Sequence, residues 1–310
     1  MSKAQSNGMG PAWDLDRIVA ELRTSRGKAQ QDRTRDGTII QMPSREALRE
    51  IVAGLFAALF PTHFGLSDFT DQGIDYFVGH KLDSTLRALQ QQVMRELLFG
   101  STMEPKELNL RASEITREFG SGLPRVRALL ETDIQAAYQG DPAARSIEEV
   151  RFCYPGITAV THHRIAHQLY LLELPLLARI VSELAHAATG IDIHPGAEIG
   201  DSFFIDHGTG VVIGETARIG RRVRLYQAVT LGAKRFPVGE DRALVKGNLR
   251  HPIVEDDVVI YAGATILGRV TIGRNSTIGG NVWLTRDVPP GSNVSQALAR
   301  TEAFDEGGGI

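Results

Sequence analysis

Two histidines, His207 and His251, stand where a regular sequence repeat is interrupted, and histidine is the side chain best suited to proton transfer at neutral pH. Its unperturbed pKa lies near ~6.5, so a neutral imidazole can take the proton of an attacking hydroxyl group as a general base. A neighbouring carboxylate would fix the tautomer of that imidazole and stabilise the imidazolium. His207 directly follows Asp206, which favours this chemistry over the alternative, a loop histidine that bonds only to nearby backbone groups.

The repeat that holds these histidines has a period of six residues between positions 193 and 290. A hexapeptide period predicts a parallel β-helix, in which each hexad forms a short strand and a turn and directs one aliphatic side chain to the axis. Stacked coils would bury these side chains in one continuous column. A sandwich of ordinary short strands is the alternative. The aliphatic anchors are Ile193, Ile199, Ile205, Ile213, Ile219, Leu225, Leu231, Val254, Ile260, Ile266, Ile272, Ile278 and Leu284.

The register of the repeat breaks at two places, and each break carries one of the histidines. The spacing between Ile205 and Ile213 is eight, so two extra residues lie near His207. Between Leu231 and Val254 comes a long polar stretch that ends just after His251. Because interruptions of a solenoid are usually loops on one face, often the binding face, both breaks are predicted to be functional.

Length and composition indicate a soluble protein of two domains. The chain has 310 residues, of which 42% are hydrophobic and 23% charged, and its net charge of −3 gives no reason to expect a nucleic-acid partner. Cys153 is the only cysteine, which excludes an internal disulfide and suits a reducing compartment. The sequence shows neither a membrane-spanning apolar run nor a signal-peptide pattern, so we expect no membrane partner and a cytoplasmic location.

The chain divides into four predicted regions. An all-α part precedes the repeat, because its apolar residues recur at helical spacing and Gly190 ends the last helix just before the first hexad. The predicted regions are a flexible segment over 1–43, an α-helical domain over 44–190, the β-helix over 191–290 with a loop at 233–252, and a tail over 291–310.

The helices can be placed from their caps and apolar stripes. Ser44 is a good N-cap, Pro61 a stop signal, and Pro124 suits the first turn of a helix. The predicted helices cover 13–23, 44–60, 71–99, 105–119, 122–139, 157–173 and 175–188, with a linker at 24–43 and a turn opened by Asp141 and Pro142.

Several of these residues form motifs specific to one family. Residues 206–210 have the sequence DHGTG, 227–232 have QAVTLG, and 250–252 have RHP. In these motifs the chain resembles the serine O-acetyltransferases, hexapeptide-repeat acyltransferases, and its long N-terminal part resembles their longer bacterial branch. The resemblance covers about half of the chain, from 133 to 290. It implies a left-handed coil, so the expected fold is α+β, an all-α N-terminal domain followed by a left-handed parallel β-helix of hexapeptide repeats.

The resemblance also implies a reaction. The family transfers the acetyl group of acetyl-CoA directly to the hydroxyl of L-serine, which gives O-acetyl-L-serine in the first step of cysteine biosynthesis. By the resemblance His207 is the base and Asp192, fifteen positions earlier, is its orienting carboxylate. His251 would donate to the substrate carboxylate or to the developing oxyanion. The residues implied for binding serine are Asp141, Pro142 and Asp206 near the ammonium group, and Arg250 and His251 at the carboxylate.

The same resemblance extends to the co-substrate and to partners. Acetyl-CoA would lie along a groove between coils, with Gly232, Ala262 and Gly280 at its pantetheine, and no metal or tightly bound cofactor is expected. The family packs three β-helices side by side, so we expect a homo-oligomer, either a trimer or a dimer of trimers. A C-terminal tail ending in isoleucine, here Ile310, implies binding to O-acetylserine sulfhydrylase, the next enzyme of the pathway.

Four alternatives remain open at this point. Asp141 before Pro142 is also a good helix cap. The scaffold could carry another acyl transfer, to a sugar or to a substrate on an acyl carrier. It could carry a γ-carbonic-anhydrase-like zinc site made from His194, His207 and His251, or it could serve only as an interaction module.

Overall fold

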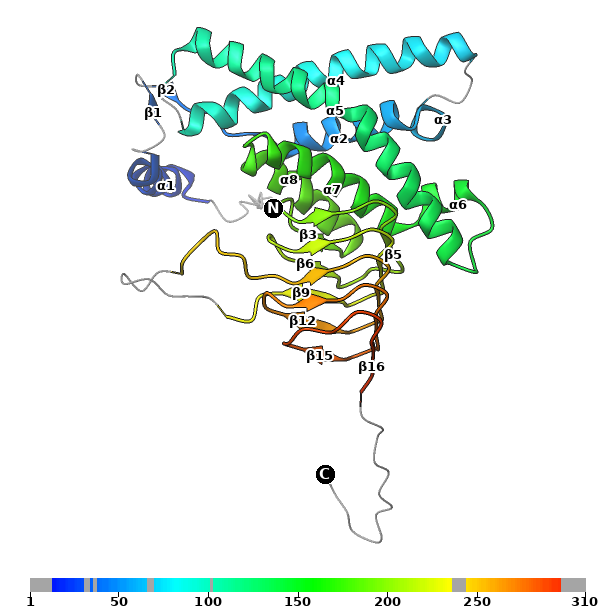
Figure 1. Cartoon of the computed structure of the whole chain (residues 1–310). Helices are drawn as coiled ribbons and strands as arrows, with labels where there is room; N and C mark the ends of the chain where they lie inside the picture. Colours follow the sequence, from blue (N-terminus) through cyan, green and yellow to red (C-terminus); the bar gives the residue numbers. More distant parts are fainter. Residues whose placement is uncertain are drawn as a thin grey trace, which may run out of the picture.

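A computed structural model describes residues 13–30, 34–35, 38–65, 70–100, 103–235 and 244–296. Its helices form a layer above a parallel β-helix, whose coils descend from the helices toward the C-terminus (Figure 1). The predicted succession of an all-α part and a β-helix is therefore confirmed. The helices are α1 (Leu15–Gln30), α2 (Arg45–Leu59), α3 (Pro61–Phe64), α4 (Asp71–Gly100), α5 (Pro105–Gly140), α6 (Ile147–Cys153), α7 (Pro155–Leu171) and α8 (Pro175–Thr189).

Local signals set several of these helix ends as predicted. The Ser44 hydroxyl accepts the N–H of Ala47 at 3.2 Å, so Ser44 caps the N-terminus of α2. Gly190 ends α8 in the left-handed conformation, with φ of 70°, which glycine adopts without a steric penalty.

Two helix predictions differ from the structure. The helix expected at 13–23 continues to Gln30, because the polar residues expected to form a linker are mostly good helix formers. The helices expected at 105–119 and 122–139 are one helix, α5, with Pro124 in its interior. An interior proline costs about 3 kcal/mol. Here Phe119 and Val126 are both buried in the core, so packing on both sides of Pro124 outweighs that cost.

The β-helix has three flat faces, each a parallel sheet. The β3 face contains β3, β6, β9, β12 and β15, the β4 face contains β4, β7, β10 and β13, and the β5 face contains β5, β8, β11, β14 and β16. Their bounds are β3 (Asp192–Ile193), β4 (Glu198–Ile199), β5 (Phe204–Ile205), β6 (Val212–Ile213), β7 (Arg218–Ile219), β8 (Arg224–Leu225), β9 (Thr230–Gly232), β10 (Ile253–Val254), β11 (Val259–Ile260), β12 (Thr265–Leu267), β13 (Thr271–Ile272), β14 (Thr277–Ile278), β15 (Trp283–Leu284) and β16 (Asn293–Val294). A separate antiparallel pair, β1 (Thr34–Arg35) and β2 (Thr38–Ile39), lies within the predicted linker.

The hexad anchors form the core of the coil as predicted. Every predicted anchor lies in a strand, and all except Ile199 are buried. Anchors pair across coils, for example Ile219 with Val254 and Val254 with Ile272. The long polar stretch is inserted between β9 and β10 and leaves this register intact. β16 continues the β5 face into the segment that was predicted as a tail.

A buried ion pair joins the helices to the first coil. Arg164 of α7 donates from Nε and Nη2 to the two carboxylate oxygens of Asp133 of α5, each at 3.0 Å. The same guanidinium donates to the carbonyls of Ile199 and Gly200, at 2.7 and 2.6 Å. The Phe203 N–H donates to Asp133 at 2.9 Å. One ion pair thus fixes α5, α7 and the turn between β4 and β5 to one another.

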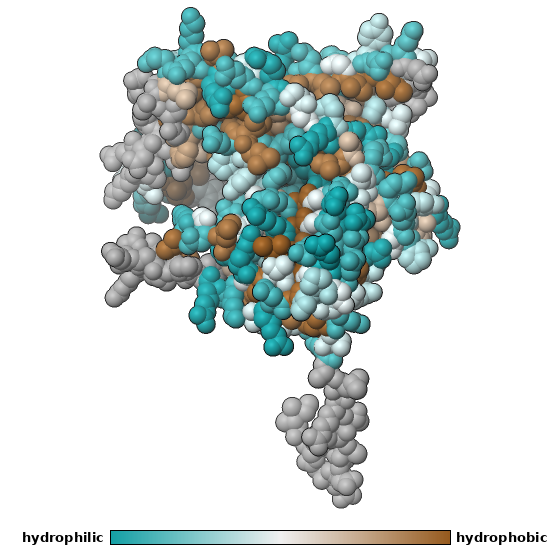
Figure 2. Space-filling view, viewed as in Figure 1, coloured by the Kyte–Doolittle hydropathy of each residue, from teal (hydrophilic) through white to brown (hydrophobic). Residues whose placement is uncertain are grey.

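The surface seen in Figure 2 is mainly polar over the β-helix, with brown patches between teal side chains. On the β3 face Val212 and Trp283 are 37% and 69% exposed. Within the described ranges, no helix has both the length and the apolar run that a membrane span requires.

Candidate active site

His207 lies in a bulge at the turn that enters the β3 face. Backbone hydrogen bonds place Asp206 over Tyr226 and Thr209 over Gln227 in the next coil, so His207 and Gly208 are the two extra residues of the first register break. Both have left-handed backbones, with φ of 56° and 89°. The same conformation recurs at other corners of the coil, for example at Ser202, Arg222 and Asp257, so it marks a tight turn. The bulge holds the His207 side chain 72% exposed.

The carboxylate nearest to His207 is that of its own neighbour. Oδ1 of Asp206 lies 3.9 Å from Nε2 of His207. Asp192, at the start of β3, instead lies beside Glu183 and His186 of α8 and 4.0 Å from Nη2 of Arg179. Across the described part of the chain, no ion pair within 4.0 Å joins Asp192 to His207. The predicted dyad of Asp192 and His207 therefore remains a prediction.

Asp141 lies near the same bulge. It directly follows α5, and its carboxylate accepts the Tyr154 hydroxyl at 2.5 Å and the N–H of Ala143 at 2.8 Å. The hydrogen bond from Tyr154 is the main cause that lowers the pKa of Asp141, and the nearby charge of His207 contributes. Asp141 is therefore an anion at neutral pH. It opens a turn and does not cap the next helix, because the N-cap of α6 is Ser146. We call Asp141, Asp206 and His207 the His207 corner.

A second cluster lies at the turn that leaves the β3 face. Arg250 donates from Nη2 to Glu215 at 2.6 Å and from Nη1 to the carbonyl of Asn248 at 3.1 Å. His251 is 6% exposed, and its Nδ1 accepts the N–H of Thr216 at 3.0 Å. We call Arg250, His251, Glu215 and Thr216 the Arg250 corner.

The hydrogen bond from Thr216 determines the tautomer of His251. Nδ1 is an acceptor, so the neutral ring carries its proton on Nε2 and can donate from there. Burial, with the charge of Arg250 as a second cause, lowers the pKa of His251 to about 4. His251 thus stays neutral at physiological pH, which suits a hydrogen-bond donor and does not suit a general base.

Within one chain the two corners do not meet. His207 precedes β6 and Glu215 follows it, so the width of the β3 face separates them. At roughly 3.3 Å per residue, the strand between them spans on the order of 15 Å. The residues predicted to bind acetyl-CoA also lie at opposite edges of the β3 face. Ala262 and Gly280 stack at the turn of the His207 corner, whereas Gly232 ends β9 at the other edge.

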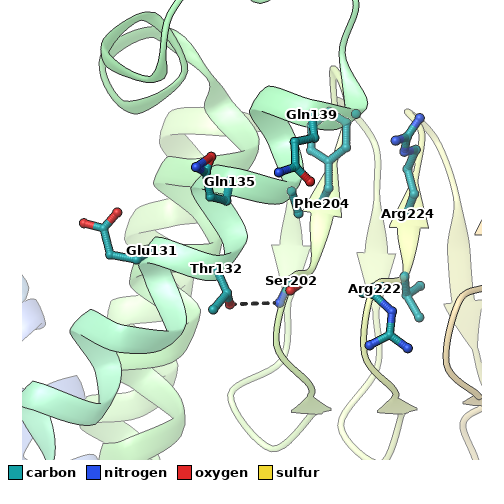
Figure 3. A pocket seen from close by; sticks show the side chains of 11 residues that line it. Glu131, Thr132, Gln135, Gln139, Ser202, Phe204, Arg222 and Arg224 are labelled. Atoms are coloured by element: carbon teal, nitrogen blue, oxygen red, sulfur yellow. Dashed lines mark hydrogen bonds between the residues drawn. The ribbon is translucent and has the colours of Figure 1, made fainter.

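A hollow of ≈ 560 Å³ lies between α5 and the β5 face (Figure 3). Its lining includes Gln135, Gln139, Phe204 and Arg224, and the Thr132 hydroxyl accepts the Ser202 N–H there at 3.0 Å. Among the described residues that line this hollow none is a histidine, so the hollow does not hold the predicted base.

Comparison with known proteins identifies the family. Residues 251–286 match the model described as bacterial transferase hexapeptide (six repeats). The plasmid serine acetyltransferase of Synechococcus elongatus is 56% identical over 305 residues, which cover 96% of each chain. The chain belongs to the serine acetyltransferase family. A serine acetyltransferase of Mycobacterium tuberculosis is 49% identical over 162 residues, 52% of this chain and 67% of its own.

Solved serine acetyltransferases have the same architecture. Isoform 3 of Entamoeba histolytica, in complex with cysteine, matches with a TM-score of 0.69 at 33% identity, and the match covers 95% of this chain and 96% of that one. The Neisseria gonorrhoeae enzyme in complex with serine matches with a TM-score of 0.53 at 29% identity, over 82% and 97% of the two chains. The helical region and the coil are thus those of a serine acetyltransferase, consistent with the left-handed form of the β-helix.

The structure brings into the candidate site several residues that the sequence prediction missed. Tyr154 holds Asp141, Thr216 fixes the tautomer of His251, and Glu215 pairs with Arg250. The pairing of β7 with β10 is the signal that could have identified Glu215 and Thr216. Because Arg218 pairs with Ile253, counting back along both strands places Glu215 and Thr216 beside Arg250 and His251.

Gly214 is a further residue of the Arg250 corner, because the ring of His251 packs directly on its Cα. A Cβ at position 214 would lie 2.0 Å from Cδ2 of His251, which is too close for any real contact. We expect Gly214→Ala to displace the imidazole and to lower kcat/KM for serine by about 10- to 100-fold. The measurement is steady-state kinetics, together with circular dichroism to establish that the variant is folded.

The matched control is Gly27→Ala in α1, where an added Cβ meets nothing within 4 Å. This control is expected to keep wild-type kinetics. Unchanged kinetics in Gly214→Ala would show that the position of His251 does not matter for turnover.

Proposed function

We propose that this chain transfers the acetyl group of acetyl-CoA to the hydroxyl of L-serine, with His207 as general base. The observation that carries the proposal is the 56% identity to a serine acetyltransferase along 96% of the chain. The geometry of both corners supports it, because one offers an exposed imidazole among carboxylates and the other a guanidinium beside a neutral imidazole donor.

The proposed step is a direct transfer. His207 removes the proton of the serine hydroxyl while the oxygen attacks the carbonyl carbon of the thioester. The carbon–sulfur bond then breaks, and the leaving CoA thiolate takes the proton back from the imidazolium. Asp192 remains the predicted partner that orients His207. The N–H at Nε2 of His251 is available to the substrate carboxylate or to the oxyanion of the tetrahedral intermediate.

Serine binding is proposed to use the charges of both corners. The carboxylates of Asp141, held beside Pro142, and of Asp206 suit the substrate ammonium. The guanidinium of Arg250 suits the substrate carboxylate, because its planar fork can make two parallel hydrogen bonds. A free amino acid is therefore the acceptor that this charge pattern favours.

A complete site requires a second copy of the chain. The two corners lie on opposite edges of the β3 face, so the Arg250 corner of a neighbour would have to face the His207 corner of this chain. Such a neighbour would also cover the exposed Val212 and Trp283. We propose a trimer, the typical assembly of hexapeptide-repeat enzymes, or a dimer of trimers. Acetyl-CoA would then run between Ala262 and Gly280 of one copy and Gly232 of the next.

A partner enzyme is also proposed. The family resemblance predicts that the tail ending in Ile310 binds O-acetylserine sulfhydrylase, although this tail lies outside the described residues. The full chain should retain the sulfhydrylase in a pull-down and a chain truncated before Ile310 should not. Equal retention by both would end the proposal. The cytoplasm remains the predicted compartment.

The activity itself is tested by following thiol release from acetyl-CoA in the presence of L-serine and of other hydroxyl acceptors. Release that depends on L-serine and yields O-acetylserine is expected. Preference for a sugar or for an acyl-carrier substrate would instead favour another hexapeptide acyltransferase. The zinc-enzyme alternative finds less support, because the coil sequence lacks the pair of histidines a few residues apart that such a site needs.

A further inference from the structure

The carboxylate of Glu215 links three elements of the Arg250 corner. Its Oε2 accepts from Nη2 of Arg250 at 2.6 Å, and its Oε1 accepts from the Tyr170 hydroxyl of α7 at 3.3 Å. The Arg250 and Glu215 side chains are only 24% and 25% exposed, so solvent screens this pair less than a surface pair. A helix, a turn after β6 and the end of the long loop thereby meet at one carboxylate.

The protonation states of Glu215 and Tyr170 follow from their surroundings. Burial by itself would raise the pKa of Glu215, but the hydrogen bond from Arg250 and the charges of His194 and Arg250 hold it below its ordinary value. Burial, followed by the charge of Glu215, raises the pKa of Tyr170. Glu215 is therefore an anion at neutral pH, and Tyr170 remains a protonated donor to it.

We infer that Glu215 is the positioning residue that presents Arg250 to the carboxylate of the amino-acid substrate. The inference rests on the proposed acetylation of serine. Arg250 follows the long loop, and apart from Glu215 its guanidinium donates to the carbonyl of Asn248, two residues away. A guanidinium has five N–H donors, so three remain for a carboxylate once these two contacts are made. Holding the side chain before substrate arrives reduces the ordering that binding requires.

Selectivity for a carboxylate follows from this role. L-Serinamide has the hydroxyl and the ammonium group of serine but an uncharged amide in place of the carboxylate. Misplacing Arg250 should therefore penalise L-serine and leave the already weak reaction of L-serinamide unchanged. A residue that merely stabilised the fold would affect both acceptors, and the binding of acetyl-CoA as well.

The test compares Glu215→Gln with the wild-type oligomer. The substitution keeps the size of the side chain and removes its charge. We expect the KM for L-serine to rise about tenfold, with kcat within about twofold and the KM for acetyl-CoA unchanged. The kcat/KM for L-serinamide should stay within about twofold of wild type, and Glu215→Asp should recover part of the loss. Serine binding measured by calorimetry should weaken by the same factor as KM rises.

The matched control is Glu198→Gln, which removes an exposed ion pair, Arg218 Nε to Glu198 Oε1 at 3.2 Å, on the neighbouring face. This control should leave every constant unchanged. Equal losses for L-serine and L-serinamide in Glu215→Gln, or no loss for either, would overturn the inference. If the wild type binds serine more tightly than Glu215→Gln does but transfers no acetyl group, the proposed function is wrong and the role of Glu215 stands.

Discussion

Replacing His207 with alanine is expected to lower turnover of L-serine and acetyl-CoA by at least ~100-fold, the usual contribution of a general base. The reason is specific to the serine hydroxyl, which attacks poorly while it keeps its proton. Binding of both substrates should persist, because Arg250, Asp141 and the coil remain intact. The measurement is steady-state thiol release, with serine binding followed by calorimetry.

The control for this variant is His80→Ala on α4, an exposed histidine of the helical domain. It should retain wild-type turnover. Because His207→Ala leaves a space the size of an imidazole in the proposed site, added imidazole should restore part of the activity of His207→Ala. Near-normal turnover in His207→Ala would remove the proposed mechanism and would require another base at the same corner.

The second large effect is expected on stability. Arg164→Met would leave the carboxylate of Asp133 buried without its partner, since Asp133 is 0% exposed. Breaking a buried pair from one side costs about 3–5 kcal/mol in the free energy of unfolding. The measurement is urea-induced unfolding at fixed protein concentration, because oligomerisation also contributes to apparent stability.

Two comparisons sharpen this prediction. The double variant Asp133→Asn with Arg164→Met should be less destabilised than Arg164→Met alone, because no unpaired charge remains in the interior. Arg221→Met, which breaks an exposed pair with Asp256, should cost less than about 1 kcal/mol. Equal costs for Arg164→Met and Arg221→Met would show that Asp133 and Arg164 do not fix the helices to the coil.

The coil could be predicted from the sequence because a short local repeat determines each of its strands. One aliphatic residue in every six sets each strand, and the loop between Leu231 and Val254 lies outside the register. The single helix α5 could not be predicted, because the burial of Phe119 and Val126 outweighs the cost of Pro124 and that burial is a tertiary effect. The one-turn helix α3 was missed because Pro61, its first residue, was interpreted as a stop signal. The short helix α6 was missed because Asp141 and Pro142, which precede it, signal a turn.

The candidate site could be proposed from the sequence as a set of residues but not as a geometry. The motifs and register breaks predicted that His207, Arg250 and His251 lie where the coil is interrupted, and the structure places them there, outside the strands. Which edge of the β3 face each of these residues occupies depends on the strand register, and the sequence prediction did not use that register. The predicted contact of Asp192 with His207 depends on side-chain directions, which no spacing in the sequence determines.

The proposed site for acetyl transfer to serine combines His207 of one copy with Arg250 of another. The most direct measurement mixes His207→Ala with Arg250→Ala, two variants that are each expected to be nearly inactive, and assays the reassembled oligomers. Random trimers should recover activity up to about a quarter of wild type, because that share of interfaces pairs an intact His207 with an intact Arg250. Activity no greater than the sum of the separate variants would contradict a shared site.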